Sequence, residues 1–436
     1  MEELVDVADG NRMAGQRGEK EAARFVKTVF EDLELENVEV DEFEIGGWWR
    51  DSASLRLLSP RDRTFSSRHE IIALPATPAS TVRTEIVDVG VGTPGDFEQA
   101  DIENKIVLVG ASDDIPRGYD RRFHRTEKYH RAIDAGASGF LYWAPLEGCL
   151  PSTGWVSFTF DDIGEIPACG ISKEVAERLK RYCGDGEVIG ELQIQCENAP
   201  TTSQNVSAAI GPDTEEEVLV SAHIDAHDIG EGAVDNGTGC ALLGEIGRLL
   251  SQFESQLETK VRLIAFGAEE AGSLGAKHWL AANNGDDVKC ILNLDGIGHE
   301  RTLDVCTCQF EGVEAVFAEV REELQIPIEI DPSLALFADQ WPFVERGIPG
   351  LEAKSIRDDD DRRWGLGRLW SHTDGDTLDK LDNRDLRDLV VPLAASVFKL
   401  SEQDRKLQHK TQSDVKAGID SGTEEALRIT NRWPWE

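Results

Sequence analysis

At Val218-Leu219-Val220-Ser221-Ala222-His223-Ile224-Asp225 an apolar run ends directly in residues of the kind that bind metal ions. The same arrangement recurs twice, because residues 261–266 lead to Glu269-Glu270 and residues 290–294 lead to Asp295. Short apolar runs bounded by polar residues predict buried strands. We therefore predict an α/β fold with a central mixed, mostly parallel sheet flanked by helices, in which side chains beyond the carboxyl ends of the strands converge.

Two further residues complete a candidate metal site. Asp235 lies among small residues in Gly232-Ala233-Val234-Asp235-Asn236-Gly237, where a helix is predicted to begin, and His372 follows much later in the chain. Small neighbours allow the close approach that a bridging carboxylate needs between two divalent ions about 3.5 to 4 Å apart. The set of two histidines and several acids is therefore sufficient for a two-metal hydrolase site.

Two pairs of nearby residues suggest roles. In His-x-Asp at a strand end, His223 binds a metal while Asp225 accepts the other ring N–H and fixes the tautomer. Adjacent acids point in different directions, so one of Glu269 and Glu270 binds metal while the other takes a proton from water. The residues alone leave open which acid has which role.

Each residue taken singly has a simpler explanation, because lone aspartates often cap helices and lone histidines are usually solvated or satisfied by a neighbour. Capping does not explain the order of the whole set. His227, Asp228, His278 and His299 are interpreted as neighbours without a role in the site. The glycine-rich residues 230–239 do not predict a phosphate site, since no Gly-Lys-Ser/Thr follows and the acids there repel phosphate.

The charge of the chain limits its partners. The 436 residues include 83 acidic against 45 basic side chains, a formal net charge of -38. Such a charge disfavours nucleic acid and anionic membranes, and it destabilises a compact state unless salt screens the repulsion. Because the acids are spread along the chain, we interpret them as a salt-adapted surface in preference to a trap for cationic substrates.

The cellular setting is inferred from what the sequence lacks. The start, Met1-Glu2-Glu3-Leu4-Val5-Asp6, has no basic or apolar region of a signal peptide, and no later stretch has 18 uninterrupted apolar residues. We expect a soluble, cytoplasmic protein. Its eight cysteines form no regular framework, so free buried thiols are expected. Cys306-Thr307-Cys308 alternates like a strand, but two cysteines without partners are a weak zinc signal.

The pattern of elements divides the chain. Residues 19–33 have helical spacing and residues 38–45 alternate like a strand, whereas short strand-like pieces up to about residue 200 predict a β-rich module with one or two helices. The βαβ pattern after it carries every candidate ligand and ends in an amphipathic helix, residues 382–400. We predict a discontinuous catalytic domain (1–49 and 199–405), an inserted module (50–198) and a polar C-terminal tail (406–436) that folds back or is mobile.

Several segments together resemble the co-catalytic zinc peptidases, a family that includes leucyl aminopeptidases, glutamate carboxypeptidase and carboxypeptidase Q. The resemblance is greatest to carboxypeptidase Q-type members and covers nearly the whole chain to about residue 400. The segments that show this resemblance are residues 221–239, Phe266-Gly267-Ala268-Glu269-Glu270-Ala271-Gly272-Ser273, Asn293-Leu294-Asp295-Gly296-Ile297-Gly298, Ala338-Asp339-Gln340-Trp341-Pro342-Phe343, Gly347-Ile348-Pro349 and residues 371–377. Lys105-Ile106-Val107-Leu108-Val109, Ala135-Gly136-Ala137 and Ile166-Pro167-Ala168 resemble a protease-associated domain.

The resemblance implies a role for each residue. It implies a zinc-peptidase catalytic domain with an inserted protease-associated domain, two Zn²⁺ ions for which Co²⁺ or Mn²⁺ are alternatives, and a peptide substrate. A homodimer is compatible with it. One zinc is held by His223 and Asp295, and the other by Glu270 and His372, while Asp235 bridges the two. Glu269 is then the general base and Asp225 orients His223.

This sequence departs from the family pattern at two positions. Many of the aminopeptidases have Tyr before the last histidine ligand, where it stabilises the oxyanion, but here Ser371 stands there. Gln340 replaces the usual His after the late-loop Asp339.

The function classes that remain are an aminopeptidase or dipeptidase-like carboxypeptidase, a silent binding protein on the same fold, and an amidohydrolase or cyclase. The arginines before His372 either bind a substrate carboxylate or balance the acids at residues 358–361; they are Arg357, Arg362, Arg363 and Arg368.

Overall fold

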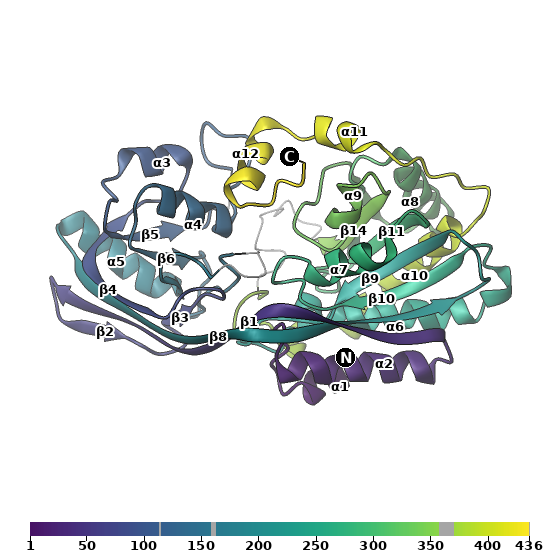
Figure 1. Ribbon diagram of the computed structural model, residues 1–436, viewed down its shortest axis with the longest axis horizontal. Coiled ribbons are helices and arrows are strands. Elements are labelled where there is room, and N and C mark those ends of the chain that lie inside the picture. Colours follow the sequence, from purple (N-terminus) through teal and green to yellow (C-terminus); the bar gives the residue numbers. More distant parts are fainter. Residues whose placement is uncertain (113–114, 158–162, 357–369, 436) are drawn as a thin grey trace.

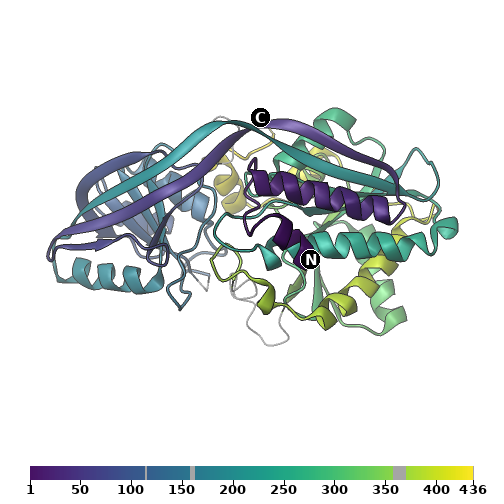
Figure 2. The same cartoon turned by 90° about the horizontal axis from the view of Figure 1, so that it is seen from below.

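Two very long strands join the two halves of the molecule. The computed structural model describes residues 1–112, 115–157, 163–356 and 370–435. In it, β1 (Glu36–Ser59) and β8 (Ile189–Ile210) pair antiparallel along almost their whole length (Figures 1 and 2). β8 also pairs with β10 (Lys260–Phe266) at one end and with β4 (Ser80–Asp88) at the other. A continuous sheet therefore runs through both halves.

The half that contains the candidate ligands, called the catalytic half below, is built on a mixed sheet, as predicted. Its strand order is β13-β12-β14-β11-β9-β10-β8, and the four strands β14, β11, β9 and β10 are parallel, whereas β8 and β12 run antiparallel to their neighbours in this group. The remaining bounds are β9 (Glu217–His223), β11 (Val288–Leu294), β12 (Thr302–Cys306), β13 (Ile328–Asp331) and β14 (Gly350–Ile356).

Helices cover both faces of this sheet, which explains why its central strands are apolar without alternation. Val218 and Val220 of β9 belong to the same core as α2, α6, α8 and α10, whereas Leu219 packs on the other side with Trp279 of α7 and Phe343 of α9. The helices are α1 (Glu2–Val7), α2 (Arg17–Asp32), α6 (Thr238–Ser251), α7 (Leu274–Asn283), α8 (Glu311–Leu324), α9 (Trp341–Val344) and α10 (Asn383–Leu400).

The inserted half contains the other end of this continuous sheet and has its own hydrophobic core. Strands β4, β5, β6 and β7 are parallel, β3 closes the edge antiparallel to β7, and β2 pairs with β1. In the part of this half that the structure describes, three helices pack against the sheet, whereas the sequence predicts one or two. The bounds are β2 (Arg63–Phe65), β3 (Ile71–Ala73), β5 (Ile106–Gly110), β6 (Gly139–Trp143), β7 (Ala168–Ile171), α3 (Pro94–Gln99), α4 (Arg125–Asp134) and α5 (Lys173–Asp185).

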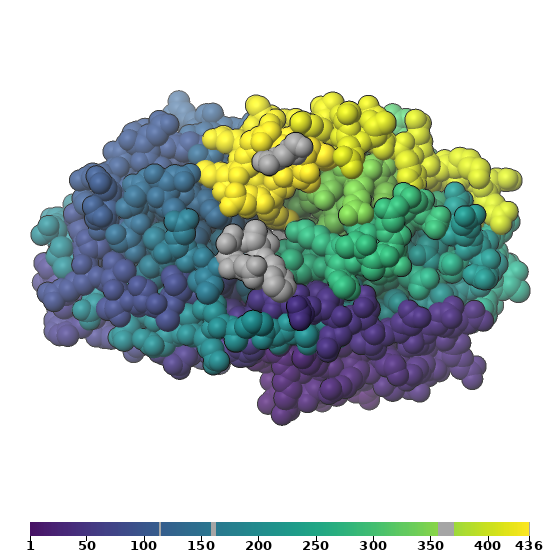
Figure 3. All heavy atoms as spheres, viewed as in Figure 1, coloured from purple at the N-terminus to yellow at the C-terminus, as the bar shows by residue number. Residues whose placement is uncertain are grey.

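The C-terminal tail folds back across both halves. It contains α11 (Gln412–Ala417) and α12 (Ser421–Ile429). Glu425 forms an ion pair with Arg131 of the inserted half (3.0 Å), and the Trp435 indole donates to the carbonyl of Glu345 in the catalytic half (3.1 Å). Figure 3 shows the tail lying against both halves. The tail is therefore an ordered strap in the part of it that the structure describes.

Three details differ from the sequence prediction. The strand predicted at residues 38–45 continues to Ser59, so the proposed domain boundary at residues 49 and 50 lies within a ladder where Trp49 faces Glu197. Strand β12 ends at Cys306, and Cys308 has a positive φ of 49°, so the two cysteines do not continue one strand. Cys149 is exposed instead of buried. Among the described residues, no helix is long and apolar enough to cross a membrane.

Candidate metal centre

Three parallel strands end at the same level and deliver their polar side chains to one place. In the ladder, Phe266 at the end of β10 lies beside His223, and Leu294 at the end of β11 lies beside Ala222. The chain beyond these ends carries Glu269-Glu270 and Asp295. Because parallel neighbours end at the same edge, the convergence predicted from the sequence is observed.

Asp235 and His372 reach the same place from loops. Asp235 lies in the irregular turn Ala233–Gly237 that precedes α6. This turn begins after Gly232, whose φ of 59° lies in the left-handed region that favours glycine. His372 belongs to the loop between β14 and the short 3-10 helix Leu378–Lys380, and its backbone also has a positive φ, of 60°.

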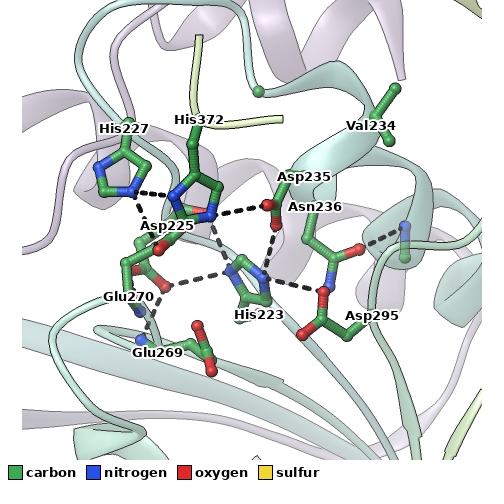
Figure 4. Close-up of polar contacts among 12 residues, drawn as sticks. His223, Asp225, His227, Val234, Asp235, Asn236, Glu269, Glu270, Asp295 and His372 are labelled. Atoms are coloured by element: carbon green, nitrogen blue, oxygen red, sulfur yellow. Dashed lines mark hydrogen bonds and ion pairs between the residues drawn. The ribbon is translucent and has the colours of Figure 1, made fainter. Parts of the chain in front are cut away.

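The five predicted ligands form two groups that share Asp235 (Figure 4). On one side, His223 Nε2 lies 3.2 Å from Asp235 Oδ1 and 3.7 Å from Asp295 Oδ1. On the other side, His372 Nε2 lies 3.2 Å from Asp235 Oδ2 and 3.4 Å from Glu270 Oε1. Each oxygen of one carboxylate thus faces a different imidazole.

These spacings fit zinc. Zn–N and Zn–O bonds of about 2.0 to 2.2 Å in tetrahedral geometry place ligand atoms about 3.3 to 3.6 Å apart. The 3.2 Å and 3.4 Å separations around Asp235 and Glu270 are close to that range, and imidazole with carboxylate is a donor set that zinc accepts. The residues present therefore fit two divalent ions.

Asp225 is connected to both groups of the site. Its backbone carbonyl lies 3.0 Å from His223 Nδ1, and its carboxylate Oδ1 is 3.5 Å from the same nitrogen. The carboxylate also accepts from the backbone N–H of Glu269 (2.9 Å) and of Glu270 (3.1 Å). The acceptor nearest to His223 Nδ1 is thus the backbone carbonyl of Asp225, while the carboxylate holds the turn that carries both glutamates.

The site concentrates negative charge away from water. Glu269 is only 9% exposed, and burial raises its pKa well above the usual range, with further increases from the carboxylates of Asp339 and Asp295. Burial also raises the pKa of Glu270 to about 7, although nearby His372 opposes the rise. Buried carboxylates are stable only when positive charge or hydrogen bonds compensate them, which two divalent ions would supply.

Three residues outside the predicted set hold the site in shape. Arg12 donates to the carbonyls of Ile224 (2.8 Å), Glu231 (2.6 Å) and Gly232 (2.7 Å). Asp376 accepts from the N–H groups of Val234 (2.7 Å) and Asp235 (3.1 Å). Glu19 accepts from Gly15 N (2.7 Å), Ser203 Oγ (2.6 Å) and Ala268 N (3.1 Å).

Only one of these three left a signal in the sequence. Glu19 of α2 lies three, four and seven positions before Ala22, Ala23 and Val26, so it is an acid on the apolar face of its helix. Such a residue needs buried partners. Arg12 and Asp376 lie in loops, and nothing local distinguishes them from surface charges.

The four neighbouring residues set aside at first divide into two kinds. His278 pairs with Asp41 (2.9 Å) and His299 lies 3.2 Å from Ser355 Oγ, both apart from the clusters that could hold a metal. Asp228 accepts two hydrogen bonds from Arg50 (2.9 and 2.6 Å). His227, in contrast, belongs to one of the two clusters, with Glu270 and His372. The structure thus places His227 at the candidate centre, close to two of the predicted ligands.

The two positions that depart from the family pattern, Ser371 and Gln340, are both buried. Ser371 is 8% exposed, and its Oγ has no hydrogen-bond partner in the described part of the chain. Gln340 is fully buried, accepts from Asn293 (3.1 Å) and donates to the carbonyl of Ala335 (2.9 Å). The arginines proposed to bind a substrate carboxylate, at positions 357, 362, 363 and 368, lie outside the described residues.

Comparison with known proteins agrees with this geometry. Residues 205–395 match the sequence model of Peptidase family M28, and residues 79–179 match that of the PA domain. Residues 205–395 are an M28 peptidase domain. The matched residues contain all five predicted ligands as well as Glu269, so the whole candidate centre lies within this domain.

Relatives of this chain span nearly its full length. Carboxypeptidase Q of Xenopus laevis is 27% identical over 385 residues, which are 85% of this chain and 78% of the relative. Aminopeptidase YwaD of Bacillus subtilis is 29% identical over 422 residues, 92% of this chain and 83% of the relative. Both kinds of exopeptidase name therefore occur among the relatives.

Solved structures share the fold. An M28 peptidase precursor from Shewanella amazonensis superposes with a TM-score of 0.73 at 23% identity, covering 93% of this chain and 94% of that one. The zinc aminopeptidase BSAP from Bacillus subtilis superposes with a TM-score of 0.69 at 24% identity, covering 91% and 93%. The two-lobed arrangement of the M28 and PA domains is thus a known architecture.

Proposed function

We propose that this protein is a metal-dependent exopeptidase that hydrolyses peptide bonds at a two-zinc centre. The observation that carries the proposal is the position of Asp235, whose two oxygens lie 3.2 Å from the Nε2 atoms of His223 and His372 respectively. A carboxylate between two imidazoles, each backed by a further acid, is the arrangement a bridging ligand requires.

The residues have distinct roles in this proposal. His223 and Asp295 would hold one ion and Glu270 and His372 the other, with Asp235 shared. Zinc, when bound there, polarises the peptide carbonyl and lowers the pKa of water. Glu269 accepts the proton of the attacking water and delivers it to the departing amine. Its carboxylate is buried beside the proposed metal positions, and a general base acts from within hydrogen-bond reach of the proton that it takes up.

The fixed backbone around Glu269 supports this role. Asp225 accepts from the backbone N–H of Glu269, and Glu19 accepts from that of the preceding Ala268. Ala268 has a φ of 54°, a conformation that costs a non-glycine residue roughly 1 kcal/mol or more and persists only where neighbours enforce it. A general base held in this way needs little reorganisation during the reaction.

Other functions are less well supported. A silent binding protein on this fold is disfavoured because all five predicted ligands are present and close together. An amidohydrolase or cyclase with the same centre remains the alternative chemistry. Relatives bear both aminopeptidase and carboxypeptidase names, so end specificity is left to experiment.

The test measures metal content and turnover at high salt. We expect two zinc ions per chain, and hydrolysis that differs between a dipeptide with a free amine and its N-blocked form. Glu269→Gln should keep both ions and lose about 10²- to 10⁴-fold in kcat, as removal of a general base does. Glu322→Gln, on the exposed face of α8, is the matched control. Full activity in Glu269→Gln would exclude it as the base.

Three further expectations belong to the same proposal. The surface is adapted to high salt, the protein is cytoplasmic, and a homodimer is compatible with its function. A metal-free protein that cannot be reconstituted would favour the binding-protein alternative over the enzyme.

A further inference from the structure

The imidazole of His227 touches two of the proposed ligands at once. Its Nε2 lies 3.0 Å from Glu270 Oε2 and 3.2 Å from His372 Nδ1. The rings of His227 and His372 meet edge to face, with centroids 4.5 Å apart (Figure 4). The His227 side chain is only 4% exposed, so these contacts are made away from water.

The atoms that His227 touches are not those that face the metal position. Glu270 presents its other oxygen, Oε1, to His372 Nε2 at 3.4 Å, and this Nε2 lies 3.2 Å from the shared Asp235. His227 therefore contacts the outward oxygen of one ligand and the outward nitrogen of the other. Outward atoms of metal ligands are commonly held by hydrogen bonds that fix the orientation of the inward ones.

The direction of these hydrogen bonds follows from the acceptors. An ionised carboxylate can only accept, so the 3.0 Å contact assigns the proton on His227 Nε2 to a bond with Glu270 Oε2. His372 Nδ1 has the carbonyl of Thr153 at 3.3 Å as an acceptor, which assigns its proton there and leaves Nε2 with a lone pair. With these protons, the 3.2 Å approach of His227 Nε2 to His372 Nδ1 is a packing contact and not a hydrogen bond. Both ligands are then in the form that binds a metal.

The loop that carries His227 is fixed on both sides. On one side, the backbone N–H of Ala226 donates to the carbonyl of Arg12 (3.0 Å). On the other, Asp228 is held by two hydrogen bonds from Arg50, whose guanidinium also reaches Thr153 Oγ1 (3.3 Å). The same arginine thus connects the His227 loop to the residue whose carbonyl faces His372. A ring held in this way can fix the orientation of its partners.

We propose that His227 is the positioning residue of the second metal position: it fixes Glu270 with one oxygen inward and packs against His372, without itself entering the coordination sphere. The proposal rests on the proposed function, because it assumes that Glu270 and His372 bind a metal ion. The inference goes beyond the proposed function because it assigns a role to His227, which is neither one of the five ligands nor the general base.

The test replaces the imidazole of His227 by a ring of similar size that has no nitrogen. Apoprotein of the wild type, His227→Phe, His227→Gln and the exposed control His409→Gln is titrated with Co²⁺ and Zn²⁺ against a competing chelator, and folding is checked by circular dichroism. We expect His227→Phe to lower the affinity for one of the two ions by about 10- to 100-fold, which is the usual effect of losing such a partner, and to leave the affinity for the other ion unchanged. His227→Gln, whose amide can still donate to Glu270, should recover most of the loss.

A spectroscopic readout separates positioning from ligation. At saturating Co²⁺, we expect the visible absorption of His227→Phe to match that of the wild type, since the coordinating atoms are the same. A spectrum showing loss of a coordinated imidazole would overturn the proposal in favour of direct ligation. If the wild type binds two ions and His227→Phe binds both with unchanged affinity, this proposal alone is overturned. If the wild type binds no ion, the proposed function is overturned as well.

Discussion

Replacing Glu19 by Ala should damage both the stability and the activity of the protein, although Glu19 touches neither metal position. Its carboxylate accepts three hydrogen bonds, from Gly15 N (2.7 Å), Ser203 Oγ (2.6 Å) and Ala268 N (3.1 Å). Leaving a buried donor without an acceptor costs about 1 to 3 kcal/mol each. Three such losses predict roughly 3 to 9 kcal/mol of destabilisation.

The effect on activity follows from the third of these bonds. Without the acceptor, the strained backbone at Ala268 is free to relax and to carry the Glu269 carboxylate with it. A displacement of about 1 Å at a catalytic group costs on the order of 10²-fold in rate. We therefore expect Glu19→Ala to lose about 10- to 100-fold in kcat/KM while it still binds two ions.

Glu19→Gln separates the two effects. Ser203 and Ala268 both donate to Oε1, and only Gly15 donates to Oε2. An amide with its oxygen at the Oε1 position keeps two of the three bonds, so it should cost only about 1 to 3 kcal/mol and keep most of the activity.

The assay is urea denaturation of metal-loaded protein in concentrated KCl, together with peptide hydrolysis. Glu21→Ala on the same helix is the control, because its pair with Arg17 is solvent-exposed and worth at most about 1 kcal/mol. A Glu19→Ala protein with wild-type stability, or a destabilised one with unchanged kcat/KM, would refute the reasoning.

Three further predictions concern pH, metal and salt. Burial raises the pKa of Glu345 to about 7. The contribution of Glu345 to stability is therefore present below about pH 4.5, its ordinary pKa, and is lost as pH rises through about 7. Glu345→Gln should flatten the pH dependence of Tm in that window, and an unchanged slope would count against this prediction. Each ion stabilises the folded protein by about 4 kcal/mol when the free metal concentration is a thousand times Kd, so chelation of both ions should lower Tm accordingly. A Tm that does not respond to chelator would argue against bound metal. Dialysis from molar KCl into dilute buffer should abolish the far-ultraviolet circular dichroism of the folded state, and an unchanged spectrum would contradict salt adaptation.

The sequence was sufficient for those parts of the site whose signals are local. An apolar run followed at once by a ligand, as at His223 and Asp295, identifies both the strand and the side chain at its end. The parallel register then brings these ends together without further information. The turn with Asp235 and the glutamate pair were found for the same reason.

Residues that act through tertiary contacts could not be predicted in this way. Arg12 and Asp376 lie 219 and 141 positions, respectively, from backbone groups that they bind, and no local pattern encodes such pairing. Strand β1 was predicted only to residue 45, because Gly46-Gly47 interrupts the alternation that indicates a strand, and its pairing with β8 was not predicted. His227 was set aside because one imidazole in a loop has many simpler explanations than contact with Glu270.

The position of the two metals decides the central claim. A crystal of zinc-loaded protein, with diffraction recorded on both sides of the zinc absorption edge, should show two anomalous peaks about 3.5 to 4 Å apart, one on each side of Asp235. One peak is expected beside His223 and Asp295, and the other beside Glu270 and His372. A single peak, or two peaks that do not share Asp235, would contradict the account.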